Sequence, residues 1–334
     1  MNRARHRLAL AAQPVQSDAE AGATPWIGPD GQVMRRLELH VTWHCPERCV
    51  FCSEDHRMQA FNPFAATWGR LARVIRTHAG RGVQAVHFTG GEPTIHPRFI
   101  DLLRLCRQLG LRTSVGTIGT MLARPAFAEQ AVPLLDEALF SLHGPDAAAH
   151  DALAGREGSF ETVTRAITLA KQIAPGFRAA VNTVVTRRNL EQLPDTVALA
   201  ASLGVGLIIV SNTTPEGAAA DRYAELAVPL DDLARVLPTV PGRAGSAIIR
   251  FFGVPMCVLG EHRMLSNDLH WDPRVTAEWA RHPGRVVFDD FYNWRPDRKR
   301  THVPACGSCE MSALCTGVYA EFAERFPTDR LRPI

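Results

Sequence analysis

Short apolar runs alternate with amphipathic stretches through the middle of the chain. Apolar residues recur at helical spacing in 68–80, and similar helical segments are expected at 97–110, 124–132, 160–173 and 190–203. Ser159 stands where it can cap the helix that begins near residue 160. Between the helical segments lie β-prone runs at 37–42, 83–89, 111–117, 137–143, 178–185 and 205–211.

Six strands that alternate with helices predict parallel βαβ units. A closed barrel of this type needs eight units, so two architectures stay open: a partial barrel and a doubly wound sheet. In both, functional residues gather at the carboxyl ends of the strands. Side chains that directly follow a strand are therefore the first candidates for a site.

The alternation of strands and helices does not extend to the two ends of the chain. Residues 1–36 contain turn-forming residues without periodicity, and we expect an irregular N-terminal lead-in there. We expect the main domain at 37–215. The remainder, 216–334, has one strand-like run at 247–257 and then weak periodicity, which predicts a small irregular C-terminal region.

Composition excludes several classes of protein. The 334 residues are 46% hydrophobic and 21% charged with a formal net charge of +3, which is typical of a globular protein and not of a disordered, collagen-like or coiled-coil chain. Acids nearly balance the cations, so nothing indicates binding to nucleic acid. No apolar stretch approaches the roughly 20 residues of a membrane helix, and the start is no secretory signal. We expect a cytoplasmic protein with no membrane partner.

Three cysteines follow the first strand directly. Cys45, Cys49 and Cys52 form a C-x3-C-x2-C loop, and three thiolates so close together can converge on one soft metal centre. Three thiolates leave tetrahedral zinc one ligand short. On a [4Fe–4S] cluster, the same three leave one iron open, and that iron can bind a small molecule.

A second motif follows the second strand. Gly90, Gly91 and Glu92 precede Pro93 there. Glycine lets backbone approach a ligand closely, and a carboxylate complements an ammonium group. Taken alone, the motif also suits an ordinary turn.

Further cysteines lie near the C-terminus. Cys306, Cys309 and Cys315 are clustered, and Cys257 is the natural fourth ligand. Four thiolates suit either one fully ligated [4Fe–4S] cluster or a structural zinc ion. Cys106 lies on the apolar face of a helix and is expected in the core.

Together, the cysteine loop and the G-G-E-P element resemble the radical S-adenosylmethionine (SAM) superfamily. Phe51 occupies the aromatic position before the last cysteine of that family's motif. The resemblance implies an α/β fold, a partial (βα)6 TIM-like barrel, in which Glu92 and the glycines hold the amino group of SAM. It further implies SAM contacts at strand ends, by Thr117, Ser141 and Asn182.

The C-terminal cysteines resemble the auxiliary-cluster domains of the same superfamily, called SPASM with two clusters and twitch with one. Tyr319 stands where the SPASM pattern has a further cysteine. The resemblance therefore implies a single auxiliary [4Fe–4S] cluster, with zinc as the alternative.

The chemistry implied by this resemblance is reductive cleavage of SAM. An external electron donor, such as flavodoxin or ferredoxin, reduces the first cluster, and a 5′-deoxyadenosyl radical then takes hydrogen from a substrate. We expect a small biosynthetic substrate, because only 36 residues precede the first strand and one auxiliary cluster is typical of small-molecule members. One alternative is a maturase of a ribosomally made peptide. Another, of a different class, is an iron–sulfur or zinc protein without radical chemistry, for which the G-G-E-P element has no use.

Overall fold

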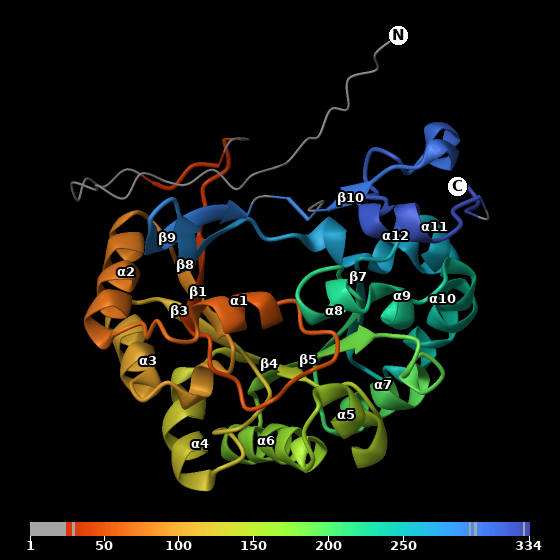
Figure 1. Cartoon of the computed structure of the whole chain (residues 1–334). Helices are drawn as coiled ribbons and strands as arrows, with labels where there is room; N and C mark the ends of the chain where they lie inside the picture. Colours follow the sequence, from red (N-terminus) through yellow and green to blue (C-terminus); the bar gives the residue numbers. More distant parts are fainter. Residues whose placement is uncertain (1–24, 29–30, 294, 297–298, 330) are drawn as a thin grey trace.

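A nine-stranded sheet organises the computed structural model, which describes residues 25–28, 31–293, 295–296, 299–329 and 331–334 (Figure 1). The strand order is β7-β6-β5-β4-β3-β2-β1-β8-β9, parallel from β7 through β8. A two-stranded sheet pairs β10 (Arg300–Thr301) with β11 (Val318–Tyr319). The nine strands are β1 (Arg36–Thr42), β2 (Ala85–Gly90), β3 (Arg112–Thr117), β4 (Glu137–Ser141), β5 (Arg178–Val185), β6 (Leu207–Asn212), β7 (Ile248–Phe252), β8 (Arg274–His282) and β9 (Arg285–Asn293).

Helices form an outer arc around the strands, while α1 and α8 lie near the centre of the ring in Figure 1. The arc consists of α2 (Trp68–Gly80), α3 (Phe99–Gln108), α4 (Pro125–Ala131), α6 (Ser159–Ile173) and α7 (Leu193–Ser202). The other α-helices are α1 (Asp55–Phe61), α5 (Ala147–Ala154), α8 (Ala218–Asp221), α9 (Tyr223–Leu226), α10 (Leu230–Val236), α11 (Met256–Leu259) and α12 (Ala320–Arg325).

Alternation along the strands builds the core. On β1, Leu37, Leu39 and Val41 are fully buried in the main apolar cluster, together with residues of the surrounding helices. Side chains of a strand alternate between its two faces, so Glu38 and His40 lie on the opposite face. The inner side of the curved sheet therefore carries polar groups, and the outer side is sealed by helices.

The structure confirms the α/β partial-barrel fold and all six expected strands to within two residues. The sheet is larger than expected, because β7, β8 and β9 follow residue 215 and join it. The domain limits at 36 and 215 stay predictions, and most of the lead-in at 1–36 lies outside the described residues. Cys106 is fully buried in the core, as expected. The prediction for Ser159 was wrong: Gly158, at φ 78°, is the N-cap, and the Ser159 hydroxyl bonds Glu47 instead.

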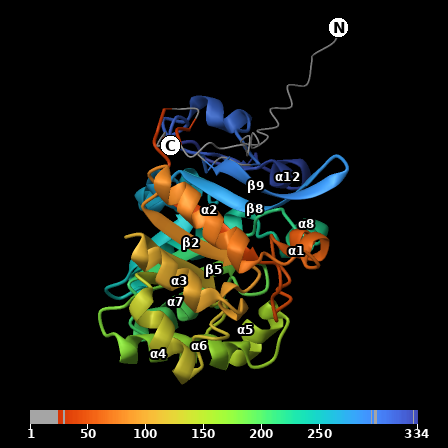
Figure 2. The same ribbon diagram turned by 90° about the vertical axis from the view of Figure 1, so that its left-hand side faces the viewer.

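The β8–β9 hairpin brings the C-terminal part of the chain against the first strand. β8 pairs with β1 in parallel, from Arg36 opposite Arg274 to Leu39 opposite Ala277. In Figure 2 the hairpin lies between α2 and the C-terminal region. Strands 1 and 8 thus bring together residues more than 230 positions apart. Among the described residues, no helix combines the length and apolar character needed to cross a membrane.

Candidate active site

The cysteine loop, residues 45–52, follows β1 and is clamped by α5. The amide of Arg48 donates to the carbonyl of Ala154 at 3.0 Å, and that of Val50 donates to Leu153 at 2.9 Å. Gly155 then turns away at φ 67°, and a Cβ there would lie 2.4 Å from the carbonyl oxygen of Arg48. Only glycine permits this close approach, so the end of α5 fixes the path of the loop.

Two further contacts hold the loop from its other sides. The amide of Ala218, on α8, donates to the carbonyl of Cys52 at 2.9 Å. Glu47 is 3% exposed, and its carboxylate accepts from the Ser159 hydroxyl at 2.7 Å and from the Cys49 thiol at 3.5 Å. Burial raises the pKa of Glu47. Hydrogen bonds of the surrounding protein therefore define the loop by themselves.

All three cysteines of the loop have free thiols, and each thiolate would be repelled by the others. Burial raises the pKa of Cys45 to about 12 and that of Cys52 to about 11, and it also raises the pKa of Cys49. Neighbouring carboxylates and the other thiols of the loop raise these pKa values further. Binding of a metal ion displaces protons from such thiols. The loop thus presents three soft ligands in a protected place, which fits the cluster that the resemblance implies.

Gly90 and Gly91 bring the end of β2 against the segment that leads into Cys45. The amide of Gly91 donates to Thr42 at 2.7 Å, and that of Glu92 donates to His44 at 2.8 Å. A Cβ on Gly90 would lie 2.2 Å from the Thr42 oxygen, and one on Gly91 would lie 2.3 Å from the His44 oxygen. The two glycines are therefore required by backbone packing beside the cysteine loop.

Glu92 is fully buried, and its carboxylate accepts several hydrogen bonds. Its carboxylate accepts from the amide of Thr94 at 3.0 Å, the amide of Ile118 at 2.8 Å and the hydroxyl of Thr117 at 2.8 Å, and also from the Thr94 hydroxyl. A carboxylate offers about four lone-pair sites, so little capacity remains for an ammonium group. In this structure Glu92 joins the turn after β2 to the turn after β3, and its contact with SAM stays a prediction.

The other expected SAM contacts lie at neighbouring strand ends. Ser141 of β4 is paired in register with Asn182 of β5, whose amide oxygen accepts from the Ser211 hydroxyl of β6 at 2.6 Å. Phe51 is buried edge-on against the ring of His143, with the centroids 4.6 Å apart. The structure therefore groups Ser141 and Asn182, while Thr117 belongs to the Glu92 network and Phe51 packs under the loop.

The four cysteines of the C-terminal set line one small cavity: Cys257, Cys306, Cys309 and Cys315. Burial raises the pKa of Cys257 to about 11, with contributions from the other three thiols. The amides of Met256 and Gly317 donate to the sulfur of Cys315 at 3.5 and 3.4 Å. Such hydrogen bonds to sulfur are typical of iron–sulfur sites.

The donor set leaves two centres open for the C-terminal cysteines, because four thiolates suit either a fully ligated [4Fe–4S] cluster or a structural zinc ion.

Tyr319, which stands where the SPASM pattern has a further cysteine, packs within the C-terminal region. Its ring is 3% exposed, and its hydroxyl lies 3.1 Å from that of Thr214, beyond β6. The guanidinium of Arg300 lies over the ring and pairs with Asp268 at 2.5 Å, and both charged side chains are at most 3% exposed. The tyrosine thus supports the fold of this region.

Two acidic side chains, one buried and one partly buried, and a buried histidine escaped the sequence analysis. Glu47 supports the cysteine loop, while His40 of β1 lies near Glu278 of β8. The alternation of Leu37, Leu39 and Val41 is the signal that could have placed His40 on the opposite, inner face of β1. Nothing local in the sequence indicated that β8 lies next to β1.

Comparison with known proteins gives the chain a family context. Residues 39–200 match the model of the radical SAM superfamily. PqqA peptide cyclase from Gluconobacter oxydans is 30% identical over 179 residues, 53% of this chain and 49% of the relative. AdoMet-dependent heme synthase from Oleidesulfovibrio alaskensis is 28% identical over 192 residues, 58% of this chain and 49% of the relative. The chain spans about half the length of these relatives.

Solved structures share the fold. Streptococcus suis SuiB bound to S-adenosylmethionine has a TM-score of 0.60 at 17% identity, and the match covers 90% of this chain and 76% of that one. SuiB bound to its precursor peptide SuiA has a TM-score of 0.54 at 20% identity, with 66% and 49% covered. At these identities the likeness describes the architecture.

Proposed function

Because this chain belongs to the radical SAM superfamily, we propose that it is an enzyme that cleaves SAM reductively and modifies a ribosomally made peptide. The family implies a [4Fe–4S] cluster and SAM. The observation that carries the proposal is the three-cysteine loop, clamped at the carboxyl ends of the strands directly beside the turn that contains Glu92.

Cys45, Cys49 and Cys52 are the ligands we assign to this cluster. When bound, the cluster and SAM together supply one-electron cleavage of a sulfur–carbon bond. The chain's own contribution is to hold the three thiolates in a loop whose path is set by α5 and α8. Burial of this loop also limits access of water to the reacting groups.

SAM is assigned to the strand ends beside the loop. Gly90 and Gly91 place bare backbone there, and Ser141 with Asn182 offers a hydroxyl and an amide on adjacent strands. Glu92 and Thr117 hold the turns that shape this place, so their effect on SAM binding is through position. Phe51 keeps the loop packed on His143.

The substrate assignment follows the relatives. The expectation of a small biosynthetic substrate rested on the short stretch before the first strand, but the relatives favour the alternative. A PqqA peptide cyclase is among the matched proteins, and SuiB, which shares the fold, has been seen with the precursor peptide SuiA. We therefore place the peptide first, and the heme synthase relative keeps a small molecule as the competing substrate.

For the C-terminal cysteine set we propose a second, auxiliary [4Fe–4S] cluster. Four thiols that line one cavity and two backbone donors to Cys315 support it. We assign residues 216–334 to this twitch-like region and an external flavodoxin or ferredoxin to the electron supply.

Anaerobic turnover tests the proposal in two stages. The iron-loaded, reduced protein is incubated with SAM, and 5′-deoxyadenosine is measured by chromatography; none formed would leave an iron–sulfur or zinc protein without radical chemistry. The same reaction then receives short peptides encoded beside the gene. A peptide whose mass or cross-linking changes supports the maturase, whereas turnover of a small metabolite with every peptide unchanged contradicts it.

A further inference from the structure

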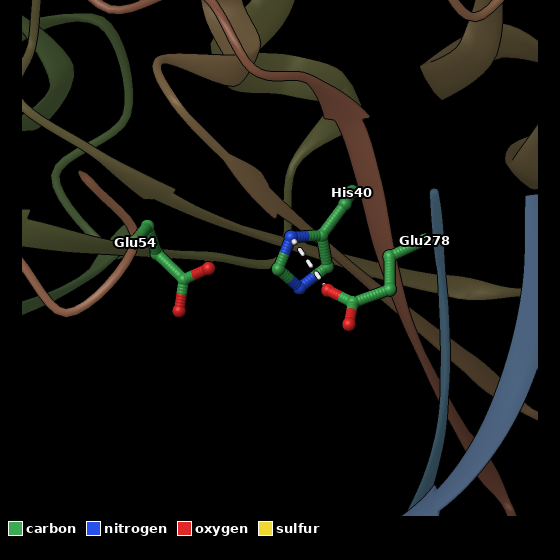
Figure 3. A group of neighbouring side chains, drawn as sticks. All are labelled: His40, Glu54 and Glu278. Carbon is green, nitrogen blue, oxygen red and sulfur yellow. Dashed lines mark ion pairs between the residues drawn. The ribbon is translucent and has the colours of Figure 1, made fainter. Parts of the chain in front are cut away.

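Three side chains from distant parts of the chain meet beside β1. His40 lies on that strand, Glu54 immediately before α1, and Glu278 on β8, and the two carboxylates turn toward the imidazole (Figure 3). One nitrogen of the histidine and one oxygen of each glutamate all lie within 4.8 Å of one another. We propose that these three residues bind a divalent first-row transition metal ion, at a site additional to the two cysteine sets.

The orientation of His40 points to a ligand. The side chain is 6% exposed, and among the described residues its buried Nδ1 has no hydrogen-bond partner, although it lies 3.5 Å from Glu278 Oε2. A buried nitrogen without a hydrogen bond costs free energy unless something else binds it. On the far side of the ring, Nε2 faces Glu38 Oε1 at 3.8 Å. A carboxylate behind the second nitrogen is the arrangement that orients metal-binding histidines in proteins.

The surrounding charges leave room for a cation. Arg57 Nη1 donates to Glu54 at 3.1 Å, and its Nε lies 3.6 Å from Glu278 Oε1, so one guanidinium serves two carboxylates. Glu278 Oε2 stays turned toward His40. Glu38 is matched by Arg274, whose Nε lies 3.0 Å away. Three carboxylates, Glu38, Glu54 and Glu278, thus face two guanidiniums, and the third positive charge comes either from the imidazole of His40 or from a bound cation in its place.

The donor set defines the class of metal. One imidazole nitrogen and two carboxylate oxygens suit Mn²⁺, Fe²⁺ or Zn²⁺ and offer no thiolate for Cu⁺. The ligands come from β1, from the segment before α1 and from β8. A bound ion therefore ties the C-terminal hairpin to the first strand and to the end of the cysteine loop. Because the ion binds the folded chain, binding also stabilises it.

Manganese is the probe that separates this site from the cysteines, because Mn²⁺ prefers oxygen and nitrogen to thiolate ligands. The anaerobically purified, iron-loaded protein is dialysed against chelator-treated buffer and titrated with Mn²⁺. Electron paramagnetic resonance counts the free ion, and pulsed measurements detect a nitrogen nucleus coupled to the bound ion. We expect one Mn²⁺ per chain, a nitrogen coupling and a raised melting temperature.

Variants assign the ligands. His40→Ala should abolish the nitrogen coupling and weaken binding at least tenfold, and Glu278→Gln, which keeps the side-chain shape, should weaken it similarly. His56→Ala is the matched control, because His56 pairs with the single carboxylate Asp221 at the surface. It should leave binding unchanged. Failure of the wild-type protein to bind Mn²⁺ at millimolar excess overturns the site, as does equal binding by folded His40→Ala. These outcomes do not depend on SAM cleavage.

Discussion

The cysteine loop and the C-terminal cysteine set differ in what holds them. The loop takes all three cysteines from eight consecutive residues and is clamped by backbone hydrogen bonds to α5 and α8 and by the buried carboxylate of Glu47. The C-terminal set draws on two segments 49 positions apart. It lies in 3₁₀ turns and short helices.

The difference lies in what each set of cysteines depends on. The barrel holds the cysteine loop in place, whereas the C-terminal region depends in part on its own cysteine site. The barrel determines the path of the loop through contacts that need no metal. In the C-terminal region, the buried Arg300–Asp268 pair and the bond between Tyr319 and Thr214 do part of that work, and the cysteines are expected to supply the rest through metal. Damage to the loop should therefore cost activity, and damage to the C-terminal set should cost stability.

The largest effect on stability is expected from the buried ion pair of the C-terminal region. Asp268→Asn removes the partner of Arg300 and leaves a buried cation, which typically costs about 3–5 kcal/mol. Asp272→Asn is the control, because Asp272 is 54% exposed and its pair with Arg36 contributes roughly 0–1 kcal/mol. Denaturant unfolding measures both. Equal effects would mean that the Arg300 pair does not hold the region together.

A smaller effect is expected at Glu92. Glu92→Gln puts an NH₂ group where the buried carboxylate now accepts from Thr94, Thr117 and Ile118, and an unsatisfied buried group costs about 1–3 kcal/mol. Both unfolding free energy and SAM affinity should fall. The exposed Glu261→Gln serves as the control. If SAM affinity falls while stability is unchanged, Glu92 contacts SAM directly and the hydrogen-bonded turn is not its main role.

Removing one ligand of the C-terminal set should produce a moderate effect confined to that region. Cys257→Ala should lose about half of the iron and melt at a lower temperature, because metal-binding free energy is also folding free energy. The core variant Cys106→Ala should keep its full iron content. Iron analysis and thermal melting are the measurements. A Cys257→Ala protein with full iron and an unchanged melting temperature would remove Cys257 from the ligand set.

The smallest effect is expected on the pH dependence of stability, and it comes from His150 on α5, the helix that clamps the cysteine loop. Nδ1 of His150 accepts from the amide of His143 at 3.0 Å, and burial lowers the pKa of His150 to about 4. The folded state therefore keeps this ring neutral, and its contribution is complete above pH 6.5 and is lost as pH falls toward 4. Unfolding at a series of pH values should show less of this loss in His150→Asn, whose amide oxygen can still accept. The same pH dependence in both proteins would rule out His150 as its source.

The sequence predicted what depends on local patterns. Six strands were found because their buried side alternates, and the cysteine sets were found because their spacing is short. β8 was missed because its inner residues Arg274 and Glu278 are polar, and their partners on β1 lie more than 230 positions away. Ser159 was misassigned for a similar reason, since its hydroxyl bonds Glu47 112 positions away. Long-range polar pairing leaves no periodic signal in one sequence.

The central claim is that the cysteine loop, and not the C-terminal set, is where SAM is cleaved. The measurement is the yield of 5′-deoxyadenosine from anaerobic, reduced protein in three forms: wild type, Cys257→Ala, and the triple variant with Ala at Cys45, Cys49 and Cys52. We predict product from the wild type and from Cys257→Ala, and none from the triple variant, which should keep about half of the iron and a folded barrel. Continued formation of 5′-deoxyadenosine by the triple variant would contradict the account.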